Sequence, residues 1–159
     1  MKLIVDTNKI IACLLRDGKV RRILFLPFLE LYTVQYAFDE IEKHKGELFT
    51  KVSKSAFDLI LFKAKLKLRS IRFPAEDEKY IQMAKKIANE FDLDDFPFIA
   101  LALKLNAPIW TNDKKLIIHG LKSEEYLAVD TKAVEMIIRG KSVEKIKQEL
   151  NERYLKEKG

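Results

Sequence analysis

Three acidic residues stand at the ends of predicted elements, where their carboxylates could meet in one site. Asp6 follows the short apolar run over residues 2–5, and Asp113 follows the apolar run over residues 109–111. Asp95 begins the helical apolar pattern that precedes the second run. One acid from the predicted third helix, which carries Asp39, Glu40 and Glu42, could make a fourth carboxylate.

Such a cluster favours a metal ion. Two like charges about 4 Å apart cost roughly 4 kcal/mol at an effective dielectric near 20, so close carboxylates either take up protons or bind a cation. A single cysteine and two histidines exclude a Cys/His zinc site and an internal disulfide. Oxygen ligands select Mg²⁺ or Mn²⁺, and a metal-activated water with a carboxylate to take its proton can hydrolyse a phosphodiester.

Each acid also has a structural interpretation. An aspartate such as Asp6 or Asp95 before a helix is more commonly its N-cap, and Asp113 could be a turn residue. Glu40 could be a solvated helix residue, because its neighbours at 39 and 42 are equally acidic. His44, near a predicted helix end, is interpreted as a cation that offsets the helix dipole. Position alone does not choose among these roles.

A basic segment offers a candidate surface for RNA. The net charge is +6, and no acid interrupts residues 59–75. A charge run is equally well explained as a solvated face, so binding and solvation stay open. The candidate RNA-binding residues are Lys63, Lys65, Lys67, Arg69 and Arg72.

The elements that must position these residues alternate between strands and helices. Apolar runs predict strands at 2–5, 29–34, 70–73, 109–111 and 126–129, with Pro74 closing the third. Helical periodicity predicts helices near 7–15, 20–25, 36–45, 53–67, 76–91, 94–105, 130–138 and 142–154, with a helical turn at 114–119 and Phe91 on a buried side.

This alternation indicates an α/β protein, a three-layer α/β/α sandwich with a mostly parallel central sheet and right-handed crossovers. Ligands bind such sheets at the carboxyl ends of the strands, where Asp6 and Asp113 stand. Residues 1–138 are expected to form one domain and residues 139–159 a C-terminal amphipathic extension. Its stripe could join two copies or cover the core, and it consists of Val143, Ile146, Leu150 and Tyr154.

The sequence contains no uncharged apolar run long enough to predict a membrane span, and no signal peptide is recognisable. We therefore expect a cytoplasmic protein without membrane contact.

Four motifs in order resemble a PIN domain, over about residues 1–138. They are Val-Asp-Thr-Asn at 5–8, Asp-Glu-Ile at 39–41, Asp-Asp-Phe-Pro-Phe-Ile-Ala-Leu-Ala at 94–102 and Pro-Ile-Trp-Thr-Asn-Asp at 108–113. The resemblance implies a metal-dependent ribonuclease with a parallel α/β/α sheet. Many prokaryotic members, including VapC-like proteins, are toxins of toxin–antitoxin pairs.

The resemblance also assigns roles. It implies that the metal-binding and catalytic acids are Asp6, Glu40, Asp95 and Asp113. It implies that the supporting residues are Thr7, Asn8, Thr111 and Asp94.

The leading hypothesis is a Mg²⁺- or Mn²⁺-dependent endoribonuclease that leaves 5′-phosphate and 3′-hydroxyl ends, with an antitoxin partner and a homodimeric assembly. The alternative is a PIN-like module that binds RNA or protein without cutting. A phosphoacceptor receiver-type domain is a third reading. It fits less well because it expects paired acids after the first strand, where this chain has Thr7-Asn8 after Asp6.

Overall fold

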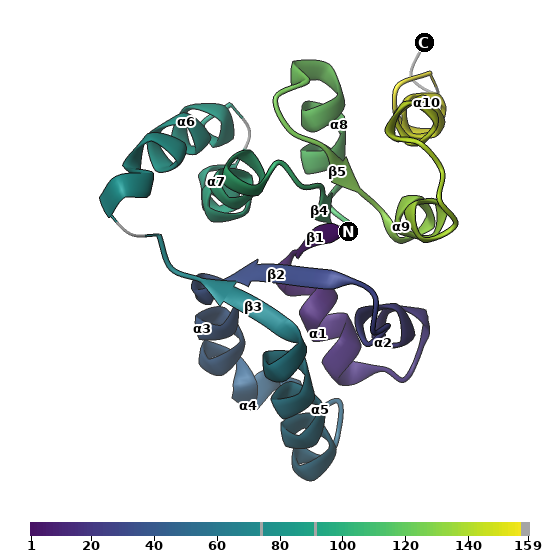
Figure 1. Cartoon of the computed structure of the whole chain (residues 1–159). Helices are drawn as coiled ribbons and strands as arrows, with labels where there is room; N and C mark the ends of the chain where they lie inside the picture. Colours follow the sequence, from purple (N-terminus) through teal and green to yellow (C-terminus); the bar gives the residue numbers. More distant parts are fainter. Residues whose placement is uncertain (74, 91, 157–159) are drawn as a thin grey trace.

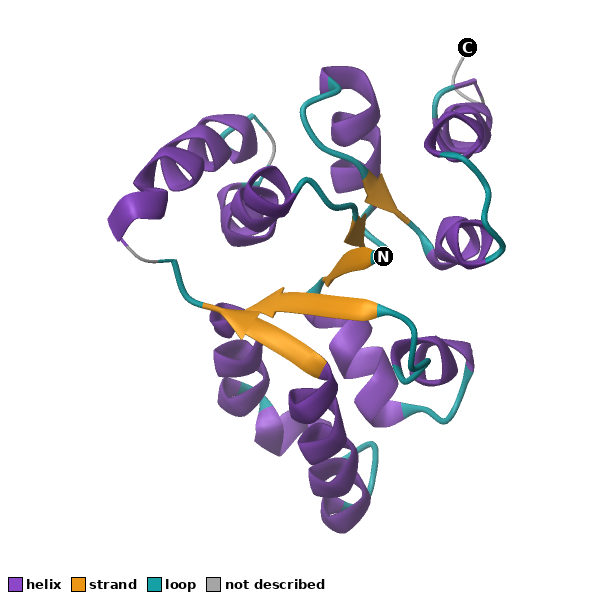
Figure 2. Ribbon diagram, in the orientation of Figure 1, coloured by secondary structure: helices purple, strands orange, loops and turns teal. Residues whose placement is uncertain are grey.

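The structure is a computed structural model that describes residues 1–73, 75–90 and 92–156, so Pro74 and Phe91 lie outside the described residues. A five-stranded sheet forms its centre, and neighbouring strands of the described chain pair in parallel. Figure 2 shows the strands fanned between helices. The strands are β1 (Lys2–Val5), β2 (Glu30–Val34), β3 (Leu68–Ile71), β4 (Ile109–Trp110) and β5 (Ala128–Val129).

The strand order β3-β2-β1-β4-β5 places a topological switch point between β1 and β4. From β1 the chain builds outward to β2 and β3, and then crosses back to add β4 and β5 on the other side. In parallel sheets the crevice at such a point, outside the carboxyl ends of the strands, is where ligands bind. Asp6 and Asp113 follow the two strands that flank it.

Helices cover both faces of the sheet (Figure 1). α6, α7 and α8 lie on one face, and α1 to α5 with α9 lie on the other. The helices are α1 (Thr7–Leu15), α2 (Lys19–Leu24), α3 (Gln35–Lys43), α4 (Lys45–Leu48), α5 (Lys54–Lys67), α6 (Glu78–Ala88), α7 (Phe96–Leu105), α8 (Lys114–Ser123), α9 (Thr131–Ile138) and α10 (Val143–Tyr154). Two 3₁₀ turns, η1 (Ala75–Asp77) and η2 (Leu93–Asp95), precede α6 and α7.

The core lies where α7 crosses β2, β1 and β4. This helix is apolar on nearly every side, which is typical of a helix buried against a sheet. Pro97 is accommodated in its first turn, where no helical amide bond is lost, and Asn106 ends it in the left-handed conformation (φ 51°). Trp110 of β4 is fully buried, as its strand pattern predicts.

All five predicted strands exist, and the first has its predicted bounds. β2 and β4 are each one residue shorter than predicted, and the other two strands differ more. The third strand begins at Leu68, because α5 ends at Lys67 as predicted and the chain turns directly into the ladder with Leu31. The fifth strand keeps only residues 128 and 129 of the predicted 126–129.

Two helices also differ from prediction. The helical turn expected at 114–119 is the complete helix α8, which Asp113 caps at its start. α3 ends at Lys43, two residues before the predicted end, and a short helix that was not predicted, α4, follows it.

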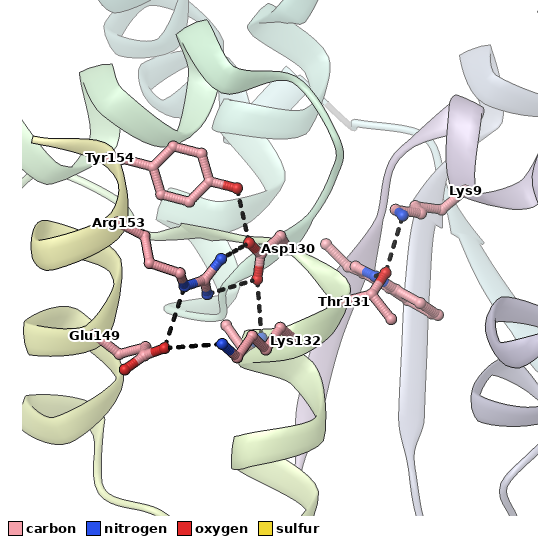
Figure 3. Close-up of polar contacts among 9 residues, drawn as sticks. Lys9, Asp130, Thr131, Lys132, Glu149, Arg153 and Tyr154 are labelled. Atoms are coloured by element: carbon pink, nitrogen blue, oxygen red, sulfur yellow. Dashed lines mark hydrogen bonds and ion pairs between the residues drawn. The ribbon is translucent and has the colours of Figure 1, made fainter. Parts of the chain in front are cut away.

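The C-terminal helix α10 packs on α8 and α9 at the β5 end of the sheet. Its stripe covers the core of its own chain, because Ile146 and Leu150 are buried. Figure 3 shows the polar contacts that fix it: Asp130, after β5, accepts hydrogen bonds from Arg153 and from the Tyr154 hydroxyl at 2.7 Å. Among the described residues, no helix combines the length and apolar character needed to cross a membrane.

Candidate active site

A cavity of about 340 Å³ opens at the carboxyl edge of the sheet, at the switch point. The side chains that line it follow β1 and β4 or come from α1, α3, α7 and the region of η2. We call it the acidic cavity, and its lining is Asp6, Thr7, Asn8, Ile11, Tyr36, Glu40, His44, Asp92, Asp94, Asp95, Phe98 and Asp113. The four acids named from the sequence therefore share one cavity, together with Thr7, Asn8 and Asp94.

Asp6 and Asp113 are connected through one hydroxyl. Thr111 is fully buried, and its Oγ1 donates to Asp6 Oδ2 at 2.6 Å. The same oxygen accepts the backbone N–H of Asp113 at 3.0 Å. Asp113 also caps α8, because its Oδ1 accepts from Lys115 N at 2.9 Å. The capping role therefore occupies Oδ1 of Asp113.

Glu40 is held by the residue that follows Asp6. The Thr7 hydroxyl donates to Glu40 Oε1 at 3.1 Å, so α1 and α3 are joined at the cavity wall. In this structure Thr111, rather than Thr7, gives its hydroxyl to Asp6. Thr7 is buried and Asn8 is exposed, which places Asn8 at the mouth of the cavity.

Asp95 has no capping role, because Asp92 takes it. Asp92 Oδ1 accepts from Asp94 N at 3.0 Å and starts η2, whereas the Asp95 side chain makes no capping hydrogen bond to α7. Asp95 Oδ2 is buried and has no hydrogen-bond partner in the described structure. A buried carboxylate oxygen without a donor is costly, so this atom is a candidate metal ligand.

Burial and mutual repulsion raise the pKa of three of the acids. Desolvation, and after it the charges of Asp113, Asp92 and Asp6, together raise the pKa of Asp95 to about 7. Desolvation also raises the pKa of Glu40, against the hydrogen bond from Thr7. For Asp6, burial outweighs the hydrogen bonds from Thr111 and the first amides of α1, and the pKa is again raised.

The donor set fits a hard divalent cation. All the acids offer oxygen, the raised pKa values report uncompensated negative charge, and a cation would relieve both that charge and the orphaned Asp95 oxygen. In the described part of the chain, however, no three His, Cys, Asp or Glu side chains stand at the spacing of metal ligands. The acids therefore share a cavity without forming a closed coordination shell.

The predicted RNA-binding residues are spread along α5 and β3 rather than gathered at the acidic cavity. Lys67 is structural, since its Nζ donates to the backbone oxygens of Leu26 and Leu29 at 2.7 and 2.9 Å. Lys65 lies 3.7 Å from Glu42, and Lys63 is exposed on the same helix.

The two arginines of the basic segment lie on β3 and after it. Arg69 stacks over the Tyr32 ring, with its guanidinium carbon 5.7 Å from the ring centroid. Arg72 follows the carboxyl end of β3. It is therefore the basic residue of this segment that lies at the same edge of the sheet as the acids.

Three polar residues of the cavity lining are not among the predicted site residues. His44 lies in the cavity wall, where its charge lowers the pKa of Glu40, rather than acting only at a helix end. Tyr36 precedes Glu40 by four residues, which is one helical turn. This spacing could have predicted that both side chains lie on the same side of α3. Asp92 could have been found from Asp92-Leu93-Asp94, which is an Asx-turn pattern.

Comparisons with known proteins agree with this architecture. A sequence model of the PIN domain matches residues 4–151, which reaches into α10. A comparison with curated proteins gives no match. The solved structure of VapBC2 from Rickettsia felis, bound to a DNA fragment from its promoter, contains a chain with a similar fold: the TM-score is 0.63 and the identity 14%, over 82% of this chain and 98% of that chain. At that identity the structural likeness confirms the predicted α/β/α fold alone.

Proposed function

The chain belongs to the PIN domain family, whose members are generally nucleases, and from this premise we propose that it is a Mg²⁺- or Mn²⁺-dependent endoribonuclease. One observation supports the proposal most strongly. Four acids from separate segments line one cavity at the switch point, and a buried oxygen of Asp95 lacks a donor.

The proposed ligands of the metal are Asp6, Glu40, Asp95 and Asp113. When bound, the ion would polarise a phosphodiester and lower the pKa of a water. Thr111 orients Asp6 and the Asp113 backbone, and Thr7 orients Glu40. A carboxylate beside the ion, such as Asp95, can accept the proton of the attacking water.

The test is cleavage of labelled single-stranded RNA with Mn²⁺, together with Mn²⁺ binding by calorimetry. Asp6→Asn and Asp113→Asn should each lower cleavage at least about 100-fold and weaken Mn²⁺ binding. Asp39→Asn is the matched control, because this exposed acid lies beside Glu40 and bonds Gln35 instead of facing the cavity. Products should carry 5′-phosphate and 3′-hydroxyl ends.

Equal cleavage by wild type, Asp6→Asn and Asp113→Asn would contradict the metal role. The alternative function, a PIN-like module that binds RNA or protein without cutting, predicts a different pattern. RNA binding would weaken with salt and persist in Asp6→Asn, with no metal-stimulated cleavage in any variant.

A protein partner and a second copy of the chain complete the proposal. The fold shared with a chain of the VapBC2 structure supports an antitoxin partner. α5 offers a surface for an assembly: Leu59, Phe62 and Leu66 lie on one helical face and are exposed by 54, 61 and 73%. We assign this face, termed the α5 stripe, to a homodimer.

A further inference from the structure

A second cavity lies beside the acidic cavity at the same edge of the sheet. Its volume is about 410 Å³, within the range of small-molecule sites, and its surface is mostly apolar. It is formed by the ends of β2 and β3 and by the starts of α3 and α7. We call it the aromatic pocket, after the lining residues Tyr36, Ile71, Arg72, Phe73, Phe96 and Pro97.

The two cavities share a wall. Tyr36 and Asp94 line both of them. Tyr36 is 43% exposed in the first turn of α3, and Glu40 lies one turn further on the same side of the helix. Desolvation and then the charges of Glu40 and Asp94 raise the pKa of the Tyr36 phenol, which agrees with a ring placed between the pockets.

We propose that the aromatic pocket holds one unpaired base of a single-stranded RNA, next to the phosphate bound at the acidic cavity. This inference rests on the proposed function for its choice of RNA. In a single strand, a base lies one sugar away from each phosphate, and bases of this kind stack on aromatic side chains. The rings of Tyr36, Phe73 and Phe96 supply such surfaces.

Charge at the rim agrees with this occupant. Arg72 is exposed at the aromatic pocket, so its guanidinium can stack on a base or meet the next phosphate. The acidic cavity, by contrast, repels phosphate until a cation is bound. RNA lying across both sites would place its base over apolar surface and an adjacent phosphate near a fixed positive charge.

The pocket offers little for reading base identity. Gln35, the amide in its wall, accepts from Ser70 Oγ at 2.8 Å and donates to Asp39 Oδ1 at 3.2 Å. With that amide engaged, recognition comes from stacking, which tolerates every base and favours larger rings. We therefore expect purines to bind more tightly than pyrimidines, and duplex RNA to bind poorly because its bases are paired.

The experiment measures binding without cleavage, by fluorescence anisotropy with Ca²⁺ in place of Mg²⁺ or Mn²⁺, and gel electrophoresis checks that the probe stays intact. The probes are a labelled oligoadenylate and an abasic ribose-phosphate oligomer of the same length. Wild type should bind oligoadenylate at least about 10-fold more tightly than the abasic oligomer. Phe73→Ala and Tyr36→Ala should lose most of that preference, whereas Tyr36→Phe, which keeps the ring, should retain it.

Phe28→Ala is the matched control, since Phe28 is 56% exposed and lies before β2, at the opposite edge of the sheet. It should retain the full preference. Thermal melting checks that each variant is folded, and the exposed Tyr36 pair carries the test if Phe73→Ala unfolds. Equal binding of both oligomers by wild type, or equal weakening of both in the alanine variants, would overturn the inference.

Cleavage with Mn²⁺ is measured separately, so the two proposals can fail independently. Cleavage by wild type without base-dependent binding would overturn the base pocket and leave the nuclease proposal standing. Base-dependent binding that the pocket variants abolish, with no cleavage under any metal condition, would support the pocket and overturn the nuclease.

Discussion

Thr111 fixes two acids with a single hydroxyl, so removing that oxygen should disturb the site without removing any carboxylate. Thr111→Val keeps the shape of the side chain but removes the donor to Asp6 and the acceptor for the Asp113 amide. Groups that orient metal ligands typically contribute 10- to 100-fold in affinity, so we expect Mn²⁺ binding to weaken by about 10-fold or more. Isothermal titration calorimetry measures the Mn²⁺ affinity of the variant and of wild type.

Thr33→Val is the control for Thr111→Val. Thr33 is as fully buried as Thr111, but its hydroxyl donates to the backbone oxygen of Val5 at 2.8 Å and touches no site acid. Both variants should lose stability from the lost hydrogen bond, and only Thr111→Val should lose metal affinity. Equal Mn²⁺ affinities in the two variants would refute the orienting role of Thr111.

Asp95 makes stability depend on pH. Its pKa is about 7 in the folded chain against an ordinary 3.8, so between these values the folded state binds more protons than the unfolded state. Stability should therefore fall as pH rises from about 4 to about 7. Allowing for solvent screening of a partly exposed group, the loss should be on the order of 1–2 kcal/mol.

Asp95→Asn should remove this loss, because an amide carries no charge at either pH. Urea unfolding at pH 4 and pH 8 should show the variant more stable than wild type at pH 8 and similar at pH 4. Mn²⁺ should protect wild type at pH 8, and Asp17→Asn, an exposed loop acid, should keep the wild-type slope. The idea fails if Asp95→Asn and wild type lose stability in parallel.

The positions of the helices and strands were predicted more accurately than the roles of individual acids. Apolar runs over 2–5 and 109–111 and the Pro97–Asn106 helix signals are local, so β1, β4 and α7 appear where predicted. The sequence allowed Asp95 to cap the helix that follows it, but Asp92 supplies the side-chain cap instead, at the start of η2, because the chain makes a 3₁₀ turn before α7. The position of this turn decides which aspartate makes the capping hydrogen bond and which is free to face the cavity. Hydrophobic periodicity does not locate the turn to within one residue.

Convergence of the four acids was predictable, but the aromatic pocket was not. Strand-end acids in a parallel sheet must share an edge, whatever the details of the loops. The pocket joins Tyr36, Phe73 and Phe96 from three elements, and its existence depends on how β3 lies against α7. Likewise, the contact of Lys67 with the backbone oxygens of Leu26 and Leu29 depends on tertiary packing, and composition alone cannot separate it from an RNA contact.

The attachment of α10 depends on Asp130. Burial pushes the pKa of Asp130 upward, but hydrogen bonds from Arg153, Tyr154 and the Ala133 amide outweigh burial and leave the pKa lowered. Arg153→Met removes the charge and leaves a largely buried carboxylate, since the Asp130 side chain is 13% exposed. Because Arg153 itself is 26% exposed, we expect a loss of about 1–3 kcal/mol in urea unfolding, less than for a fully buried pair.

Lys132→Met provides the comparison for Arg153→Met in the same network (Figure 3). Lys132 pairs with Glu149 at 3.4 Å but is 66% exposed, so its loss should change stability by less than about 0.5 kcal/mol. Hydrogen exchange should quicken in α10 of Arg153→Met and stay unchanged in Lys132→Met. Similar destabilisation by both substitutions would show that Asp130 does not anchor the helix.

At the scale of the whole molecule, the two apolar stripes differ in exposure. The α10 stripe packs within its own chain, since Ile146 and Leu150 are buried against the core. The α5 stripe remains exposed. It lies on the side of α5 opposite to the buried residues 57, 61 and 64. A homodimer that buries the more exposed of the two stripes should therefore use α5 rather than α10.

The α5 stripe predicts the oligomeric state. Wild type should elute with the mass of two chains in light-scattering chromatography, because burying Leu59, Phe62 and Leu66 against a second copy removes their apolar surface from water. Phe62→Ser combined with Leu66→Ser should give a monomer with unchanged helical circular dichroism, since both side chains face solvent in the single chain. Phe28→Ser, which removes an equally exposed phenylalanine elsewhere, should remain dimeric. A monomeric wild type, or a dimer that persists in the double variant, would remove the α5 stripe from the assembly and leave it for a different partner protein.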